Sequence, residues 1–247
     1  MLFADINGFT RFSESRSLAS VFSLVIDFVA TMDLTIRRHG GFINSLEGDG
    51  VVALFPDNAD NVPGAAISAR QTLLDTHNFA KSSLDIGIGV HSGSLLLGAI
   101  GNEEWLKCDI LGDAVNLCAR IEQLTRNFGT HNLVSEEYRS QLSEELKLRG
   151  VGQVVVRGRK QPVRLYEVLD ALETGQRDLR WQSAALFDKG VEALESGHSA
   201  NAADFFNQAL ESDPTDTVAE VMLKFATDHK NFLIETREGL ALTFPGN

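Results

Sequence analysis

The order of apolar and polar residues divides the chain into two parts with different periodicities. Up to residue 170, short apolar runs typical of strands alternate with longer segments whose apolar residues recur at helical spacing. The predicted strands are 2–4, 42–47, 51–55, 84–90, 95–100, 151–156 and 163–169, and the predicted helices are 17–38, 59–77 and 113–128. Gly40-Gly41 ends the first helix, and Gly48-Asp49-Gly50 predicts a hairpin between the second and third strands.

This order of elements predicts an α+β fold of the ferredoxin-like βαββαβ type with further elements added. Its helices are expected to pack on a largely antiparallel sheet. We assign residues 1–172 to this first domain, because the segment 173–178 is polar, contains a glycine and is typical of a boundary.

The remaining residues, 173–247, are predicted to form a small all-α tail. Three consecutive amphipathic patterns cover 181–194, 200–211 and 218–225, and no strand pattern accompanies them. Small and aromatic residues between Leu186 and Pro214 follow the spacing of one tetratricopeptide repeat. Because such repeats need about three units for stability, we expect this one to pack on the first domain, on a partner protein or on the other tail helices.

Composition narrows the classes of protein that remain. With 43% hydrophobic and 23% charged residues the chain is globular, and its net charge of −12 argues against a general nucleic-acid binder. The cysteines Cys108 and Cys118 form no CxxC pair, so neither a disulfide scaffold nor a zinc ribbon is expected. No apolar run reaches the ~20 residues of a membrane span, and no signal peptide precedes the first motif. We therefore expect a cytoplasmic protein without a membrane segment.

Two acidic turns carry the first candidate chemistry. Asp5 ends the first apolar run and either fills a turn or holds Mg²⁺, with N–H groups near Phe9 and Thr10 facing an anion. Asp49 lies at the tip of the predicted hairpin and either belongs to a type I′ turn or is a second carboxylate ligand. If the first strand pairs beside this hairpin, both carboxylates converge at one end of the sheet, which is the arrangement a divalent-metal site needs.

Two later segments carry groups suited to ribose and phosphate oxygens. Asn116 and Arg120 lie one turn apart on one face of a predicted helix, and they either bind such oxygens or form an exposed pair beside a neighbouring acid. Arg157, Arg159 and Lys160 place three cations on the tight connection between the last two strands. This turn is either an edge hairpin protected by charge or a clamp for polyphosphate.

Taken together, these segments resemble class III nucleotidyl cyclases, the adenylate and guanylate cyclase family. The resemblance runs from Leu2 to about Leu169, and its most specific parts are residues 88–98 (IGVHSGSLLLG) and 112–120 (GDAVNLCAR). It implies the cyclase fold and an adenylate cyclase that converts ATP to 3′,5′-cyclic AMP and pyrophosphate in intracellular signalling. It also implies two Mg²⁺ or Mn²⁺ ions per active site and a homodimer with its active sites at the interface.

The resemblance assigns the metal ligands to the start of the chain. Asp5 and Asp49 match the two metal-binding aspartates of the family, and the Ile6 carbonyl adds a ligand. In the family these ligands come from one subunit, whereas the residues that bind the base and the transition state come from the other.

The resemblance also assigns the nucleotide-binding residues. Asn116 and Arg120 match the pair that orients the ribose and stabilises the transition state. Asp109 matches the residue that reads the adenine amino group, and Arg157 or Arg159 matches the cation on the terminal phosphates.

One position departs from the family pattern and leaves open which purine nucleotide, ATP or GTP, is the substrate. Ser45 stands four residues before Asp49, where adenylate cyclases usually carry Lys and guanylate cyclases Glu, and in an extended strand it shares a face with Glu47. Asp109 favours ATP; the alternatives are a guanylate cyclase, or a degenerate cyclase-like module that dimerises and recruits partners through its tail. Because only four residues precede Asp5 and strands usually run about 5–6, we also expect an upstream sensor module before this chain.

Overall fold

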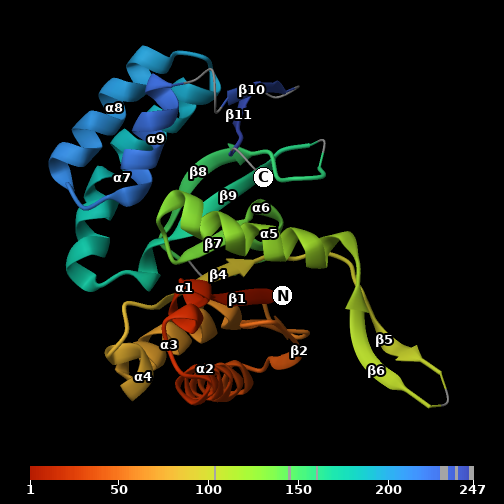
Figure 1. Ribbon diagram of the computed structural model, residues 1–247. Helices are drawn as coiled ribbons and strands as arrows, with labels where there is room; N and C mark the ends of the chain where they lie inside the picture. Colours follow the sequence, from red (N-terminus) through yellow and green to blue (C-terminus); the bar gives the residue numbers. More distant parts are fainter. Residues whose placement is uncertain (103, 144–145, 160, 229–232, 237–238, 245–247) are drawn as a thin grey trace.

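The central feature of the fold is a mixed β-sheet crossed by one long helix (Figure 1). The computed structural model describes residues 1–102, 104–143, 146–159, 161–228, 233–236 and 239–244. In this part of the chain, nine strands follow the order β10-β11-β8-β9-β7-β4-β1-β3-β2, and only the pairs β4–β7 and β11–β8 are parallel. The largely antiparallel α+β fold predicted from the sequence is therefore confirmed.

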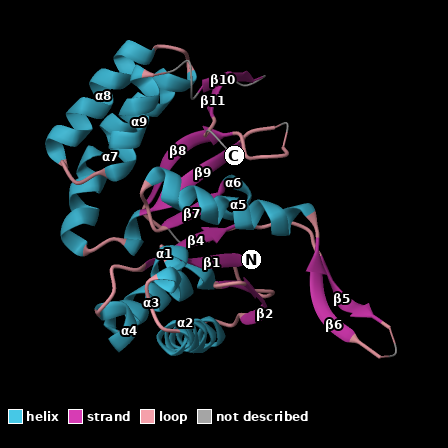
Figure 2. Cartoon of the chain, viewed as in Figure 1, coloured by secondary structure: helices cyan, strands magenta, loops and turns pink. Residues whose placement is uncertain are grey.

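The strands are β1 (Leu2–Asn7), β2 (Phe42–Glu47), β3 (Gly50–Leu54), β4 (Asp85–Val90), β5 (Leu96–Gly101), β6 (Leu106–Leu111), β7 (Asn132–Ser135), β8 (Leu148–Val154), β9 (Val163–Val168), β10 (Leu233–Thr236) and β11 (Gly239–Leu242). The helices are α1 (Phe9–Glu14), α2 (Leu18–Arg38), α3 (Asn61–Asp75), α4 (His77–Ala80), α5 (Asp113–Phe128), α6 (Glu136–Arg139), a 3-10 turn η1 (Leu169–Ala171), α7 (Thr174–Glu195), α8 (Ser199–Ser212) and α9 (Thr217–Thr227). Strands β5 and β6 form a separate hairpin that projects from the body of the molecule (Figure 2).

The two faces of the sheet are covered by different helices. Leu2, Ala4 and Ile6 alternate along β1 and pack in a core with α2 and α3. The intervening residues of β1 face α5, so Asp5 lies on the α5 side of the sheet. The strand continues through Asn7 instead of stopping at Asp5, because β4 pairs with it as far as Asn7.

Helix α2 matches its predicted range, and the Ser17 side chain caps its N-terminus. By length and composition α2 could cross a membrane. A single such helix near the N-terminus is weak evidence for a membrane span. Helix α2 buries Leu24, Phe28 and Met32 but leaves Leu18 and Phe22 exposed.

Helix α5 crosses β4 at very short distance because β4 carries two glycines there. A Cβ atom on Gly89 would overlap the backbone nitrogen of Glu122, and one on Gly87 would lie 2.6 Å from Glu122 Oε1. A side chain on Gly89 would push the backbone of α5 away from the sheet, whereas one on Gly87 would displace the Thr125 and Glu122 side chains. Gly89 therefore sets the height of α5 above the sheet.

The tail packs on the first domain, one of the three arrangements expected from the sequence. The polar segment predicted as a boundary contains the first residues of α7, which begins at Thr174 directly after η1. Leu194 of α7 and Phe206 of α8 share a core with Leu117 and Ile121 of α5. Residues 233–236 and 239–242 form strands that extend the sheet beside β8, so the expectation of an all-α tail is wrong for this segment.

Helices α7 and α8 pack against each other where the repeat-like spacing was found. A Cβ on Gly190 would lie 2.6 Å from the Phe206 ring, and Phe187 meets the same ring edge-on at 5.3 Å between centroids. The small residue in the pattern is thus needed for close packing of the helix pair. That the pair is a tetratricopeptide repeat stays a prediction.

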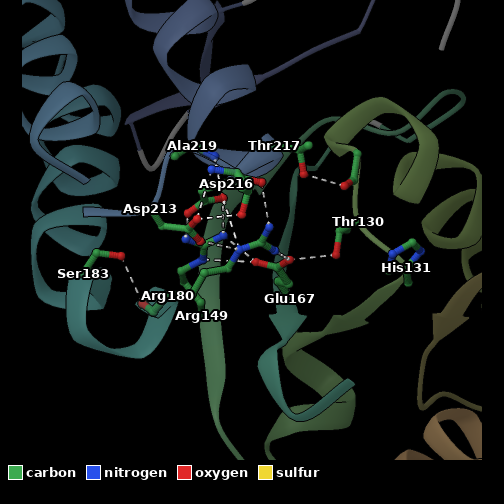
Figure 3. A network of polar contacts seen from close by, with 12 residues as sticks. Thr130, His131, Arg149, Glu167, Arg180, Ser183, Asp213, Asp216, Thr217 and Ala219 are labelled. Carbon is green, nitrogen blue, oxygen red and sulfur yellow. Dashed lines mark hydrogen bonds and ion pairs between the residues drawn. The ribbon is translucent and has the colours of Figure 1, made fainter. Parts of the chain in front are cut away.

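A buried network of charged side chains connects the tail to the sheet (Figure 3). Arg149 on β8 donates to Glu167 on β9 at 2.6 Å and to Asp216 at 2.9 Å. Arg180 on α7 donates to Glu167 at 3.0 Å and to Asp213 at 3.3 Å. Burial alone would raise the pKa of Asp216, but the hydrogen bond and charge of Arg149 hold that pKa below its usual value.

The same network reaches the C-terminal end of α5. Thr130 donates to Glu167 at 2.8 Å, and Thr217, the first residue of α9, donates to the Gly129 carbonyl at 2.6 Å. The position of α5 therefore depends on the tail as well as on β4.

We expect the substitution Arg180→Leu to lower the free energy of unfolding by about 3–5 kcal/mol, because it leaves Glu167 and Asp213 buried without one of their cations. Chemical denaturation measures this change. The control Lys224→Ala removes an exposed ion pair with Glu220 in the same tail and should cost no more than about 1 kcal/mol. Equal effects of the two substitutions would show that the network does not stabilise the fold.

Candidate active site

Two of the predicted metal ligands converge, as expected, at one end of the sheet. Asp5 lies on β1 one step beyond the pair Ala4–Val51, and Asp49 occupies the turn before Gly50 at the start of β3. Burial raises the pKa of Asp49 to about 6, and the negative charge of Asp5 and a hydrogen bond to it act in the same direction. The side chain of Ile6 is buried in the core, which leaves its backbone as the part available to a ligand. We call Asp5, Ile6 and Asp49 the acidic half-site.

A cation from α5 already faces this half-site. Arg126 Nη1 lies 3.1 Å from Asp5 Oδ2 and 3.4 Å from Asn7 Oδ1, and Nη2 lies 3.5 Å from Glu122 Oε2. Burial raises the pKa of Glu122 to about 8, and Arg126 opposes that shift. Glu122 Oε1 is buried without a hydrogen-bond partner among the described residues.

The acidic half-site fits a hard divalent cation. Within the described ranges no cluster of three or more His, Cys, Asp or Glu side chains is placed to hold a metal ion. Mg²⁺, however, is commonly bound by one or two carboxylates together with water and substrate phosphates. Burial raises the pKa of Asp49 most and the charge of Asp5 adds to that rise; a bound cation would relieve this repulsion between the two carboxylates.

The cations predicted to bind phosphate gather around the N-terminal half of α5. Arg120 is half-buried against the turn after β8, where a Cβ on Gly158 would lie 3.0 Å from its Nη1. Gly158 has φ 79°, so the turn needs glycine for its conformation as well as for this contact. Arg157 in the same turn is exposed, and Arg159 pairs with Asp113 at 3.0 Å. Lys160 lies outside the described residues.

Asn116 is exposed on the same half of α5, and the predicted base-reading residue Asp109 lies just before this helix on β6. Lys107 on the same strand donates to Asp109 at 3.0 Å. We call Asp109, Asn116, Arg120, Arg157 and Arg159 the nucleotide half-site.

The other predicted substrate contacts lie on β2 and α1. Ser45 follows a bulge in β2 between Ile43 and Ser45, and it accepts a hydrogen bond from Asn44 at 3.3 Å. Phe9 packs its side chain against the core at the start of α1, and the Thr10 side chain is exposed. Phe9 and Thr10 come shortly after β1, the strand that carries Asp5. Their backbone N–H groups lie in the first turn of α1.

The two half-sites lie on different sides of α5 within one chain. Arg126, which contacts Asp5, follows Arg120 by six residues, or about 1.7 turns, so the two guanidinium groups point in different directions. Arg120 is directed at Gly158 and Arg126 at β1.

Comparison with known proteins decides the family. Residues 1–169 match the family described as the adenylate and guanylate cyclase catalytic domain. The chain belongs to this family. This cyclase is 34% identical to an adenylate cyclase of Anabaena cylindrica over 180 residues, which cover 68% of this chain and 36% of that protein.

Two further comparisons extend this picture. An adenylate cyclase of Dictyostelium discoideum, described as terminal-differentiation specific, is 28% identical over 87% of this chain and 11% of its own length. That alignment is longer than the predicted first domain and so runs into the tail. This cyclase therefore spans about a third or less of the length of these two relatives.

Solved structures show the same fold for the cyclase. The adenylyl cyclase CyaB from P. aeruginosa has a TM-score of 0.60 and 26% identity over 68% of this chain and 91% of its own. A guanylyl cyclase has a TM-score of 0.59 and 27% identity over 68% of this chain and 89% of its own. These structures include an adenylyl and a guanylyl cyclase, so similarity of fold does not by itself distinguish ATP from GTP as the substrate.

Sequence reasoning did not identify Arg126, Glu122 or Lys107. The helical spacing of Glu122 and Arg126, four residues apart, was the only available signal for the first two. The contact with Asp5 spans 121 positions and has no local signature.

We expect Arg126→Gln to strengthen Mn²⁺ binding to the chain about 3- to 10-fold, because a cation that competes for Asp5 is removed. Electron paramagnetic resonance of free and bound Mn²⁺ measures the affinity without any turnover. Arg139→Gln, which removes a similarly exposed arginine outside both half-sites, is the control for net charge. Weaker Mn²⁺ binding in Arg126→Gln would show that Arg126 supports the metal site instead of competing with it.

Proposed function

We propose that this cyclase is an adenylate cyclase that converts ATP to 3′,5′-cyclic AMP and pyrophosphate. The observation that carries the proposal is the convergence of Asp5 and Asp49 on one side of α5 while Asn116 and Arg120 occupy another. This arrangement supplies carboxylates for a metal and cations for phosphate without any side-chain nucleophile, as an attack by the ribose 3′-oxygen on the α-phosphorus requires.

Each residue then has a defined task. Asp5, Asp49 and the Ile6 carbonyl hold two Mg²⁺ or Mn²⁺ ions, which lower the pKa of the 3′-hydroxyl and neutralise phosphate charge when bound. Asn116 orients the ribose. Arg120 donates to the oxygens of the α-phosphate, where negative charge builds in the transition state.

The remaining contacts fix the rest of the nucleotide. Arg157 and Arg159 bind the terminal phosphates, and Phe9 and Thr10 offer backbone N–H groups to phosphate oxygens. Asp109 accepts from the adenine amino group, and Ser45 lies at the edge of the base. The relatives described as adenylate cyclases support ATP as the substrate.

The proposed enzyme is a homodimer in which each active site takes one half-site from each subunit. Apolar side chains on the β5–β6 hairpin support this assembly, since Leu96, Trp105 and Leu106 are all more than half exposed in the single chain. Its signalling role and its cytoplasmic location belong to the same proposal.

A guanylate cyclase is the second candidate. Two features of the sequence favour it: position 45 is Ser instead of Lys, and the acidic Glu47 lies near the expected position of the base. The similarity to a guanylyl cyclase structure points in the same direction.

An assay of the full chain with ATP and with GTP, each with Mg²⁺ and with Mn²⁺, tests the proposal. We expect cyclic AMP from ATP and a lower kcat/KM for GTP. Preferential formation of cyclic GMP from GTP would favour the second candidate. No cyclic product from a chain shown to be dimeric would contradict both.

Mixing two inactive variants tests the shared site. Asp5→Ala and Asn116→Ala homodimers should each be nearly inactive, because every site carries one lesion. After random subunit exchange half of the dimers are mixed, and in each mixed dimer one site carries both lesions and the other none. About a quarter of all sites are then intact, and activity should recover towards that fraction. Continued inactivity after demonstrated exchange would mean that each site is built within one subunit.

A further inference from the structure

Reading a purine needs more than the one carboxylate that the sequence identified. The adenine edge presents an amino donor next to a ring-nitrogen acceptor, so a complete reader supplies an acceptor and a donor side by side. Asp109 supplies the acceptor. Ser45 is short and uncharged, and its hydroxyl already accepts a hydrogen bond from Asn44 at 3.3 Å.

Lys107 brings an ammonium group to the position next to Asp109. The two residues are separated by one position on β6 and therefore lie on the same face of that strand. Lys107 Nζ lies 3.0 Å from Asp109 Oδ2, and both side chains remain accessible to solvent. The hydrogen bond to Asp109 raises the pKa of Lys107 and lowers that of Asp109, so both groups keep their charges near neutral pH.

Strand β2, which carries Ser45, lies beside this pair. Strand β2 packs beside β6, and the negative charge of Glu47 on β2 also acts on Lys107. Beyond the bulge in β2, Ser45 and Glu47 alternate with Leu46 and so share one face of the strand. Lys107 therefore pairs with Asp109 and also feels the charge of Glu47, which shares a face of β2 with position 45.

We propose that Lys107 is the second base-reading residue of this site and donates to the adenine ring nitrogen next to the amino group bound by Asp109. The proposal rests on the adenylate cyclase function proposed above. In the same pose, guanine would place its carbonyl oxygen against the Asp109 carboxylate and its ring N–H against the Lys107 ammonium. Both contacts are repulsive, and the pair therefore selects ATP over GTP.

The test substitutes Lys107 by Met, which keeps the length of the side chain and removes its donor. We expect kcat/KM for ATP to fall about 10- to 100-fold, with a smaller change for GTP, so that the ratio of the two falls. The affinities for the unreactive α,β-methylene analogues of ATP and GTP should shift in the same sense. Lys224→Met, on the exposed face of α9, is the matched control and should leave both ratios unchanged.

A rescue experiment separates base reading from a structural role of Lys107. Adding Ser45→Lys to Lys107→Met returns an ammonium group to the same region from β2, and it should restore most of the preference for ATP. A purely structural defect of the β5–β6 hairpin would not respond to a lysine on another strand.

The outcomes distinguish this inference from the proposed function. An active wild-type chain whose ATP-to-GTP ratio is unchanged in Lys107→Met would overturn the role of Lys107 and leave the cyclase function in place. If the wild-type chain forms no cyclic product, the proposed function fails, and the analogue affinities still decide on Lys107. An unchanged affinity ratio in that case would refute the inference as well.

Discussion

The close crossing of α5 over β4 is the constraint on which the rest of the site depends. Gly89 lacks the side chain that would hold the helix off the sheet, and Gly87 leaves room for the Glu122 and Thr125 side chains. At this short distance the inner side of α5 brings Glu122 and Arg126 to Asp5 on the neighbouring strand. The N-terminal half of the helix leaves Asn116 exposed and sets Arg120 against the turn of Gly158. One helix therefore separates the acidic half-site from the nucleotide half-site.

The tail takes part in this arrangement through buried charge. Two guanidinium groups meet three carboxylates in a region from which water is excluded, and each carboxylate is paired with at least one arginine. Buried ion pairs contribute little net stability compared with apolar packing, but the loss of one partner is costly, so they favour one geometry over alternatives. Thr130 and Thr217 join this network to the end of α5. The position of the active-site helix is therefore linked to the position of the tail.

The accessible cations of the site contrast with this buried network. Arg126 pairs with Asp5, Lys107 with Asp109 and Arg159 with Asp113, and all these pairs remain accessible to solvent. Such pairs are worth at most about 1 kcal/mol, so a nucleotide or a metal ion can replace one partner at low cost. In a chain of net charge −12, Arg159 brings a positive charge to the place where the terminal phosphates are expected to bind.

The sequence by itself determined the elements whose cause is local, and it carried the motifs of the family. Helices α2 and α5 and the β2–β3 hairpin follow from apolar spacing, caps and turn residues that lie next to one another in the chain. Strands β6, β7, β10 and β11 were not predicted; they are held by hydrogen bonds to strands elsewhere in the chain, as where β7 pairs with β4 and β9. The same holds for the site. The sequence supplied Asp5, Asp49, Asn116 and Arg120, whereas only the tertiary structure placed Arg126 on Asp5, since that contact joins residues 121 positions apart and depends on the height of α5 above the sheet.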